Sequence, residues 1–276
     1  MFDPKTNKYP YTEYTDGHYL VVKNDNGLVF DNKYPYVDNS KSFKFKSKLF
    51  RIFFNLFVIP VARIRLGLKV KGRENLKKHK DVINKGIVSC CNHVHLWDFI
   101  GIAYAVRRNK PKFLVWDKNI RGALGKPIRL LGGIPLPDDN IAAQLAHFRD
   151  VKKHINNGGW LHIYSEGSSW EFYAPIRPFK KGTSAYAMIC DKPILPMAYS
   201  YRKPGWIRRN IFKQIALLSL TIGEPIYKDE SLPKGEQEDD LTKRAHAAVC
   251  ELAGINPSDN IYPAIFNNTK RIDYYN

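Results

Sequence analysis

Acidic residues are scarce in this sequence. It has 26 Asp and Glu against 44 Lys and Arg, which gives a formal net charge of +18. The imbalance is concentrated, because residues 41–80 contain thirteen Lys or Arg and a single acid, Glu74. Such a basic surface attracts nucleic acid or anionic lipid. The sequence has no zinc-finger, helix-turn-helix or RNA-binding aromatic motif, so we expect an anionic membrane surface and no nucleic acid.

Cysteine is also rare, and the spacing of the cysteines argues against a metal site and a redox site. The four cysteines show no paired metal-binding or redox spacing, and they are interpreted as free thiols of a reducing compartment. No apolar stretch follows the polar first residues, so no secretory signal peptide is expected. These thiols are Cys90, Cys91, Cys190 and Cys250.

Apolar runs are too short for a membrane span, which needs about 20 predominantly apolar residues. The most apolar segment, residues 49–62, is interrupted by Arg51, Asn55 and Pro60. Basic residues bracket it, as in helices that lie at the level of lipid head groups. We interpret residues 49–67 as an interfacial membrane-binding helix, and we expect a peripheral membrane protein on the cytoplasmic face. The alternative is an amphipathic helix packed on the protein's own core.

A histidine and an aspartate follow a short apolar run. Residues 86–91 predict a buried strand, so His93 stands at a strand end. Asp98 lies five residues further on, and the two side chains meet only if the chain turns. If Asn92 caps a helix that starts near Leu96, one nitrogen of His93 meets Asp98 and the other faces a substrate. Such a pair takes a proton from a hydroxyl that attacks an acyl carbon, although this spacing also occurs by chance.

The same region offers a rival metal chemistry. His93 and His95 have the spacing by which alternate residues of a strand or loop bind zinc. A metallohydrolase needs further ligands nearby, and Asp98 lies one residue too far for the usual arrangement. We therefore predict no metal site and interpret His95 as a pocket-lining or structural residue.

A second polar turn follows the predicted strand at residues 160–164. Glycine accepts backbone angles that present amides to an anion, and a neighbouring carboxylate accepts a hydrogen bond from a hydroxyl. Glu166, Gly167 and Ser168 are therefore predicted to bind substrate. The alternative is an ordinary turn from a strand into a loop.

Several segments together resemble those of a known family, and their order is more specific than any one of them. The family is that of the glycerolipid acyltransferases, which make phosphatidic acid from lysophosphatidic acid. The resemblance covers roughly residues 68–228, and it implies a general base at His93, an orienting carboxylate at Asp98 and a head-group site at Glu166 and Gly167. The similar segments are residues 70–76, Asn92 with His93 and Asp98, and residues 132–136, 164–169, 193–197 and 222–226.

Two arginines that the family places near the acceptor's phosphate are missing. Asp138 and Ser169 occupy their positions, and Ser165 replaces a usual proline. Arg177, Lys180 and Lys181 follow shortly after the Glu-Gly turn, and cations there are predicted to pair with phosphate oxygens instead. The alternative is a solvated basic loop.

The remaining pattern predicts an α/β fold, with a mixed central sheet flanked by helices. Strands are expected at residues 112–115, 161–164, 194–201 and 215–222, with helices around residues 141–155 and 241–252. An N-terminal hairpin is expected from residues 19–22 and 28–30. The expected organisation is a tyrosine-rich extension at residues 1–48, the interfacial helix at 49–67, a catalytic domain at 68–256 and a tail at 257–276.

The expected function is transfer of a fatty acyl group to the hydroxyl of a lysophosphatidic acid-type lipid. The donor is an acyl thioester on coenzyme A or acyl carrier protein, and no further cofactor is expected. An apolar groove lined by Trp97, Phe99 or Trp116 would hold the acyl chain. Backbone amides at residues 132–133, or at the helix start after His93, would stabilise the oxyanion. A different hydroxyl acceptor and a non-catalytic lipid-binding protein stay open as alternatives.

Overall fold

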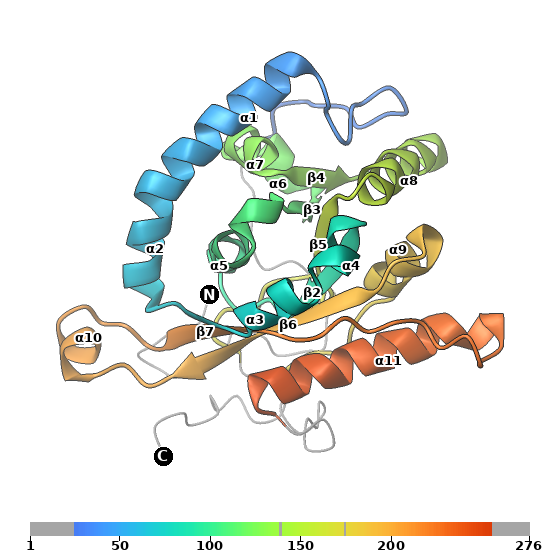
Figure 1. Ribbon diagram of the computed structural model, residues 1–276. Coiled ribbons are helices and arrows are strands. Elements are labelled where there is room, and N and C mark those ends of the chain that lie inside the picture. Colours follow the sequence, from blue (N-terminus) through green and yellow to red (C-terminus); the bar gives the residue numbers. More distant parts are fainter. Residues whose placement is uncertain (1–24, 138–139, 174, 256–276) are drawn as a thin grey trace.

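The central element of the fold is a mixed seven-stranded sheet of order β1-β7-β6-β2-β5-β3-β4. The computed structural model describes residues 25–137, 140–173 and 175–255 (Figure 1). Neighbouring strands are parallel except for the antiparallel pair of β6 and β7. The strands are β1 Lys69–Lys71, β2 Ile87–Cys91, β3 Lys112–Trp116, β4 Gly133–Leu136, β5 Trp160–Tyr164, β6 Ile194–Arg202 and β7 Leu217–Ile222.

The predicted α/β class, the mixed sheet and five of its strands are confirmed. The pattern missed β1 and β4 as strands. β1 has only three residues, of which Lys69 and Lys71 are exposed, and β4 is an edge strand that contains Pro135. Short edge strands of this kind carry little apolar alternation, and proline is tolerated at a sheet edge.

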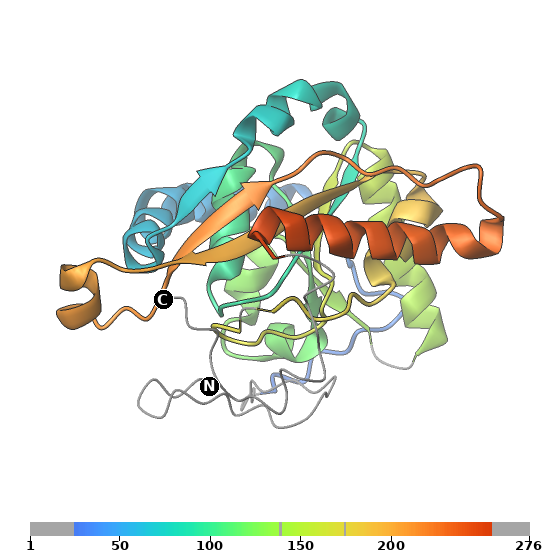
Figure 2. The ribbon, with the colours of Figure 1, turned by 90° about the horizontal axis from the view of Figure 1, so that it is seen from below.

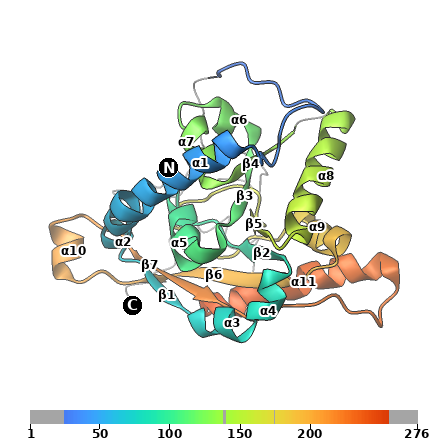
Figure 3. The ribbon, with the colours of Figure 1, turned by 45° about the horizontal axis from the view of Figure 1, so that its top comes forward.

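Helices cover both faces of the sheet (Figures 1 and 3). Residues of α2 and α5 share one core with alternate residues of the strands, such as Ile87 and Trp160. Residues of α8, α9 and α11 share the other core with the strand residues that point to the opposite face of the sheet, such as Val88 and Leu161. Both predicted helices are confirmed. The helices are α1 Lys41–Phe53, η1 Phe54–Val58, α2 Ile59–Leu66, α3 Arg73–Lys78, α4 Lys80–Asn84, α5 Asp98–Ala105, η2 Arg107–Asn109, α6 Asp117–Arg121, α7 Gly125–Leu131, α8 Ile141–Asn156, α9 Gly182–Cys190, α10 Trp206–Asn210 and α11 Lys234–Ala253.

The segment predicted as an interfacial helix is one long helical rod that begins earlier than expected. Ser40 caps α1 by accepting a hydrogen bond from the Phe43 amide at 3.2 Å. The π-turn η1 then joins α1 to α2. Arg51, which interrupts the apolar segment, donates from its guanidinium to the Leu131 carbonyl at the end of α7. Burial there lowers the pKa of Arg51 to about 10. A helix C-terminus is a favourable place for a cation, so Arg51 fastens the rod to the domain.

The described part of the predicted N-terminal hairpin has another structure. Residues 28–30 form no strand, and residues 19–22 lie outside the described residues. The segment runs over the domain surface and buries Phe30 and Tyr36, and the Tyr36 ring meets His147 of α8 edge-on at 5.1 Å. Aromatic packing therefore holds this segment in place without strand pairing.

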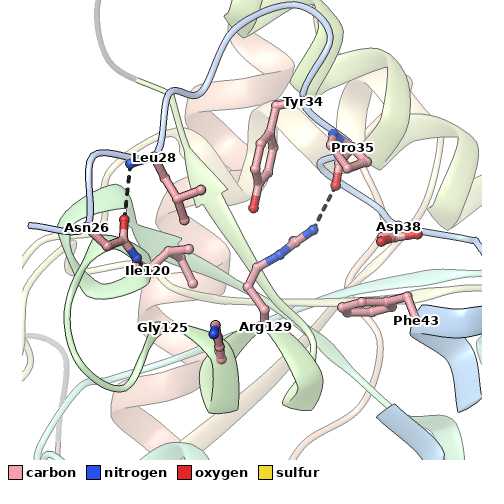
Figure 4. Close-up of a pocket in the computed structure, with 10 residues that line it drawn as sticks. Asn26, Leu28, Tyr34, Pro35, Asp38, Phe43, Ile120, Gly125 and Arg129 are labelled. Atoms are coloured by element: carbon pink, nitrogen blue, oxygen red, sulfur yellow. Dashed lines mark hydrogen bonds between the residues drawn. The ribbon is translucent and has the colours of Figure 1, made fainter. Parts of the chain in front are cut away.

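A cavity of about 450 Å³ lies between this segment and α6 and α7. Arg129 donates to the Pro35 carbonyl at 2.7 Å and lies beside Tyr34 (Figure 4). The cavity lining contains none of the predicted site residues. It is formed by Asn26, Leu28, Tyr34, Pro35, Asp38, Phe43, Ile120, Gly125, Lys126 and Arg129.

Gly86, just before β2, gives a test of the fold. It has φ of 102°, and a Cβ atom there would lie 1.9 Å from the Ile155 carbonyl oxygen. We expect Gly86→Ala to lower the free energy of unfolding by about 2–4 kcal/mol, because backbone strain and overpacking add. Urea unfolding measures the loss. Gly235→Ala on α11 is the matched control, since an added Cβ there meets nothing within 4 Å. Equal stability of the two variants would contradict the described packing.

Candidate active site

His93 leaves the sheet at the C-terminal end of β2, held by the residue before it. The Asn92 amide group accepts from the Tyr199 amide at 2.7 Å and donates to the Tyr199 carbonyl at 3.0 Å. The Asn92 side chain thus takes the place of a peptide group where β2 ends. It extends the hydrogen bonding between β2 and β6 by one residue. Asn92 is therefore not the helix cap that was predicted, because α5 begins only at Asp98.

Asp98 is the centre of the turn that follows. Its side chain is completely buried, and Oδ2 lies 2.6 Å from Nδ1 of His93. The same oxygen accepts from the amides of Val94 at 3.0 Å and His95 at 3.3 Å. A carboxylate that accepts from Nδ1 fixes the proton there and leaves Nε2 of neutral His93 as the basic nitrogen. The predicted meeting of His93 and Asp98 is therefore present.

The imidazole is also held from its face. The rings of His93 and Tyr164 stack with centroids 4.0 Å apart and an angle of 14° between their planes. Burial, and then the Asp98 carboxylate, raise the pKa of Tyr164 well above its ordinary value, so the supporting ring stays a neutral phenol. The His93 side chain keeps 23% of its surface exposed. The ring is therefore fixed and still accessible.

Glu166 connects the loop after β5 to the loop after β2. It is 6% exposed, and Oε2 accepts from the backbone amide of His93 at 2.9 Å. Its carboxylate also accepts from the Arg177 amide at 2.8 Å and from the Arg177 guanidinium at 3.2 Å. Burial raises the pKa of Glu166 and Arg177 opposes that change. This carboxylate holds the backbone that carries His93, instead of facing a head group as predicted.

Arg177 lies beneath the Glu-Gly turn and not on an exposed basic loop. It is 4% exposed, and it donates to the Ser168 hydroxyl at 2.8 Å and to the Ser168 carbonyl. Its guanidinium also lies over the Trp170 ring, 4.4 Å from the centroid. Glu166, Ser168 and Arg177 thus form a buried cluster. For Arg177, the predicted contact with acceptor phosphate does not fit this placement.

The other predicted binding residues divide between two places. Gly167 is exposed with φ of 83°, and a Cβ there would lie 2.8 Å from Cε of Lys180, so the Lys180 chain runs over the turn. Lys181 points elsewhere, because its ammonium lies 2.5 Å from Asp239 of α11. The structure therefore brings Gly167 and Lys180 together and separates Lys181 from them.

Sequence reasoning missed a cation that reaches the site from α2. The Arg65 guanidinium lies 5.2 Å from the ring of Trp97, the residue before Asp98. Nδ1 of His95 accepts from the Trp97 amide at 2.9 Å. Burial lowers the pKa of His95, with Arg65 among the charges that act in the same direction. The basic and aromatic residues around positions 63–65 and 97 were the only signal for this contact.

The predicted groove and oxyanion residues have varied surroundings. Phe99 is packed between Phe54 and Phe113. Lys118 lies over the Trp116 ring at 4.8 Å. Residues 132–133 lie at the start of β4. Strand pairing aligns Gly133 with Phe113 of β3, and through β5 with Ser89 at the middle of β2. They are therefore too far back along the sheet to stabilise an oxyanion at His93, which corrects that prediction.

The comparisons with known proteins agree with this geometry. The acyltransferase family model matches residues 67–200, which include His93, Asp98 and Glu166. Residues 67–200 are thus an acyltransferase domain, just under half of the chain. The predicted resemblance to glycerolipid acyltransferases is thereby confirmed, and the protein is an enzyme of acyl transfer.

A solved structure shares the fold of this acyltransferase. It is the crystal structure of the 1-acyl-sn-glycerophosphate (LPA) acyltransferase PlsC from Thermotoga maritima. The two chains are 20% identical with a TM-score of 0.51, over 78% of this chain and 83% of PlsC. No curated protein sequence matches this chain significantly. Within the described residues of the acyltransferase, no group of three or more His, Cys, Asp or Glu is placed to hold a metal ion.

The Glu166 and Arg177 pair gives a test that separates structure from substrate binding. Arg177→Ala leaves a buried carboxylate without its partner, so we expect the free energy of unfolding to fall by about 3–5 kcal/mol. The double variant Glu166→Gln with Arg177→Met removes both charges, and its free energy of unfolding is expected to fall by less. Urea unfolding measures the stability of both variants.

Lys181→Ala is the control, because its exposed ion pair with Asp239 contributes little to stability. An Arg177→Ala protein of wild-type stability would show that the buried pair does not support the fold.

Proposed function

We propose that this acyltransferase moves a fatty acyl group from an acyl thioester to the hydroxyl of a lysophosphatidic acid-type glycerolipid, making phosphatidic acid for phospholipid synthesis. The donor is acyl-coenzyme A or acyl-acyl carrier protein. The observation that carries the proposal is the 2.6 Å contact between His93 Nδ1 and the buried Asp98 carboxylate, with the ring still accessible. This arrangement suits a base that acts on a hydroxyl.

In the proposed reaction, Nε2 of His93 takes the proton of the acceptor hydroxyl as its oxygen attacks the thioester carbonyl. The tetrahedral intermediate collapses by breaking the carbon–sulfur bond, and the leaving thiolate takes the proton back from Nε2. The acyl group thus passes directly to the acceptor, without a covalent acyl-enzyme. Asp98 stabilises the imidazolium that exists between the two proton transfers.

The surrounding contacts support this role because they fix the base before substrate arrives. Tyr164 holds the ring face, Asp98 holds Nδ1, and Glu166 holds the backbone amide of His93. Positioning groups in advance removes part of the entropic cost of bringing reactants together. Glu166 and Arg177 are therefore proposed to act as positioning residues for His93.

Two cations of the described chain are placed to favour a phosphate-bearing acceptor. The Lys180 chain crosses Gly167, and the Arg65 guanidinium covers Trp97. Lys180 lies against the loop after β5, and Arg65 lies over Trp97 in the turn that follows His93. We assign them the role that the resemblance gives to arginines at positions 138 and 169, which are Asp138 and Ser169 in this chain.

An acceptor other than lysophosphatidic acid is the second candidate, and the burial of Arg177 favours it. Two predicted phosphate ligands are engaged within the protein, because Arg177 is paired to Glu166 and Lys181 is paired to Asp239. A neutral hydroxyl acceptor needs none of them. The third alternative, a lipid-binding protein without activity, does not account for the oriented His93.

We also propose that the acyltransferase binds anionic membranes from the cytoplasmic face through the α1–α2 rod. The described residues contain no helix with the length and hydropathy of a membrane span. Anionic lipid suits the basic residues that lie along the rod. Its outer face carries an exposed apolar stripe made of Phe45, Leu49, Ile52, Phe53, Leu56, Phe57, Val61 and Ile64, which are 47–69% exposed.

Acyl transfer to lysophosphatidic acid from both donors tests the catalytic assignment. We expect His93→Ala and Asp98→Asn each to lower kcat by about 100- to 10,000-fold, the range that a general base contributes. Lys78→Ala is the control, because Lys78 belongs to an exposed ion pair with Glu224. Activity that survives in folded His93→Ala protein would contradict the proposed base.

A comparison of acceptors tests the proposed phosphate contact. Lys180→Ala is expected to raise KM for lysophosphatidic acid about tenfold, the loss of one charge-assisted hydrogen bond, and to leave KM for monoacylglycerol unchanged. Lys181→Ala removes the same charge from the next residue and is expected to change neither value. Equal effects of Lys180→Ala on both acceptors would refute the contact, and transfer to monoacylglycerol alone would favour the second candidate.

A further inference from the structure

The tip of the β6–β7 arm is an exposed apolar feature outside the α1–α2 rod. Residues 203–216 connect the two antiparallel strands and contain the short helix α10 (Figures 1 and 2). Four large apolar side chains there face solvent. They are Trp206 at 72% exposure, Ile207 at 58%, Ile211 at 61% and Phe212 at 67%. Such side chains in one short segment indicate a contact surface.

The charge of this arm is of one sign. No Asp or Glu occurs between residues 192 and 223, whereas Lys203, Arg208, Arg209 and Lys213 surround the apolar tip. Tryptophan and phenylalanine ringed by lysine and arginine are typical of segments that enter the interface of an anionic bilayer. The composition therefore favours negatively charged lipid as the partner.

Hydrogen bonds fasten the arm to the end of the α1–α2 rod. The Arg208 guanidinium donates to the Ile64 carbonyl at 2.8 Å, and the Gln214 amide donates to the Arg65 carbonyl. Arg202 donates to the Gly67 carbonyl. Figure 3 shows α10 next to the α2 end on the same side of the molecule. The tip therefore lies beside the rod's apolar stripe.

We propose that the α10 tip is a second membrane-inserting element, which enters an anionic bilayer together with the α1–α2 stripe. This inference rests on the membrane contact under the proposed function. Two elements that insert together fix the tilt of the protein on the surface, whereas a single rod leaves it free to rotate about its axis. Arg65 belongs to the fastened junction and covers Trp97. The fixed orientation thus keeps Arg65 and the Trp97 ring near the lipid.

Vesicles of phosphatidylglycerol and phosphatidylcholine test the proposal with the full-length protein. We expect Trp206→Ser with Phe212→Ser to weaken cosedimentation about tenfold, because the loss of interfacial apolar area lowers partitioning. Leu56→Ser with Phe57→Ser tests the rod in the same way. Ile141→Ser with Leu145→Ser on α8 is the matched control, since these exposed apolar residues lie outside both surfaces. Urea unfolding establishes that each variant is folded.

Tryptophan fluorescence gives an independent readout of insertion. Lipids brominated in the acyl chain are expected to quench the wild-type protein, and Trp206→Phe is expected to lose most of that quenching. Equal quenching of wild type and Trp206→Phe, or wild-type cosedimentation of the Trp206→Ser and Phe212→Ser variant, would overturn the proposal.

The failure of this inference can be distinguished from the failure of membrane binding itself. If only the Leu56 and Phe57 variant loses cosedimentation, the rod binds membrane and the tip does not. If wild type fails to bind vesicles, both ideas are wrong. If the tip variant binds vesicles normally but loses transfer from acyl carrier protein alone, the tip docks that acidic protein, and the lipid proposal is again refuted.

Discussion

The buried carboxylate of Asp98 is the interaction on which the rest of the site depends. One oxygen accepts from the His93 ring and from the amides of Val94 and His95, so a single charge closes the turn and orients the imidazole. These three donors help to compensate the desolvation of the carboxylate. The loop after β5 adds a second buried carboxylate, Glu166, which accepts from the His93 backbone amide. Fold stability and catalytic geometry are therefore coupled here, because the same contacts serve both.

Much of this arrangement could be predicted from local sequence. Apolar runs predicted β2, β5, β6 and β7, because strands that are buried in a sheet consist of short, continuous apolar segments. The spacing of His93 and Asp98 required a turn, and the turn is present. The order of the similar segments by itself indicated the family. Each of these inferences rests on residues close to one another in the chain.

The features that could not be predicted depend on contacts between distant residues. Asn92 meets Tyr199, 107 positions away, and nothing near Asn92 distinguishes that role from a helix cap. Arg177 stands among prolines and lysines, a composition typical of an exposed loop, and only the folded chain places it under Glu166. Arg51 is similar, since its partner carbonyl at Leu131 is 80 positions away. Charged residues are seldom buried unless paired, and local sequence does not show the pair.

The antiparallel β6–β7 arm determines how far the α10 tip lies from the His93 turn. Asn92 holds Tyr199 within β6, and the exposed tip begins at Trp206. Seven residues of nearly extended chain reach about 20 Å, so the arm sets the distance between the His93 turn and the tip. Lengthening or shortening it by a pair of residues keeps the side-chain alternation of the ribbon and changes only its reach. The length of the arm can therefore vary while the turn that holds His93 and Asp98 stays the same.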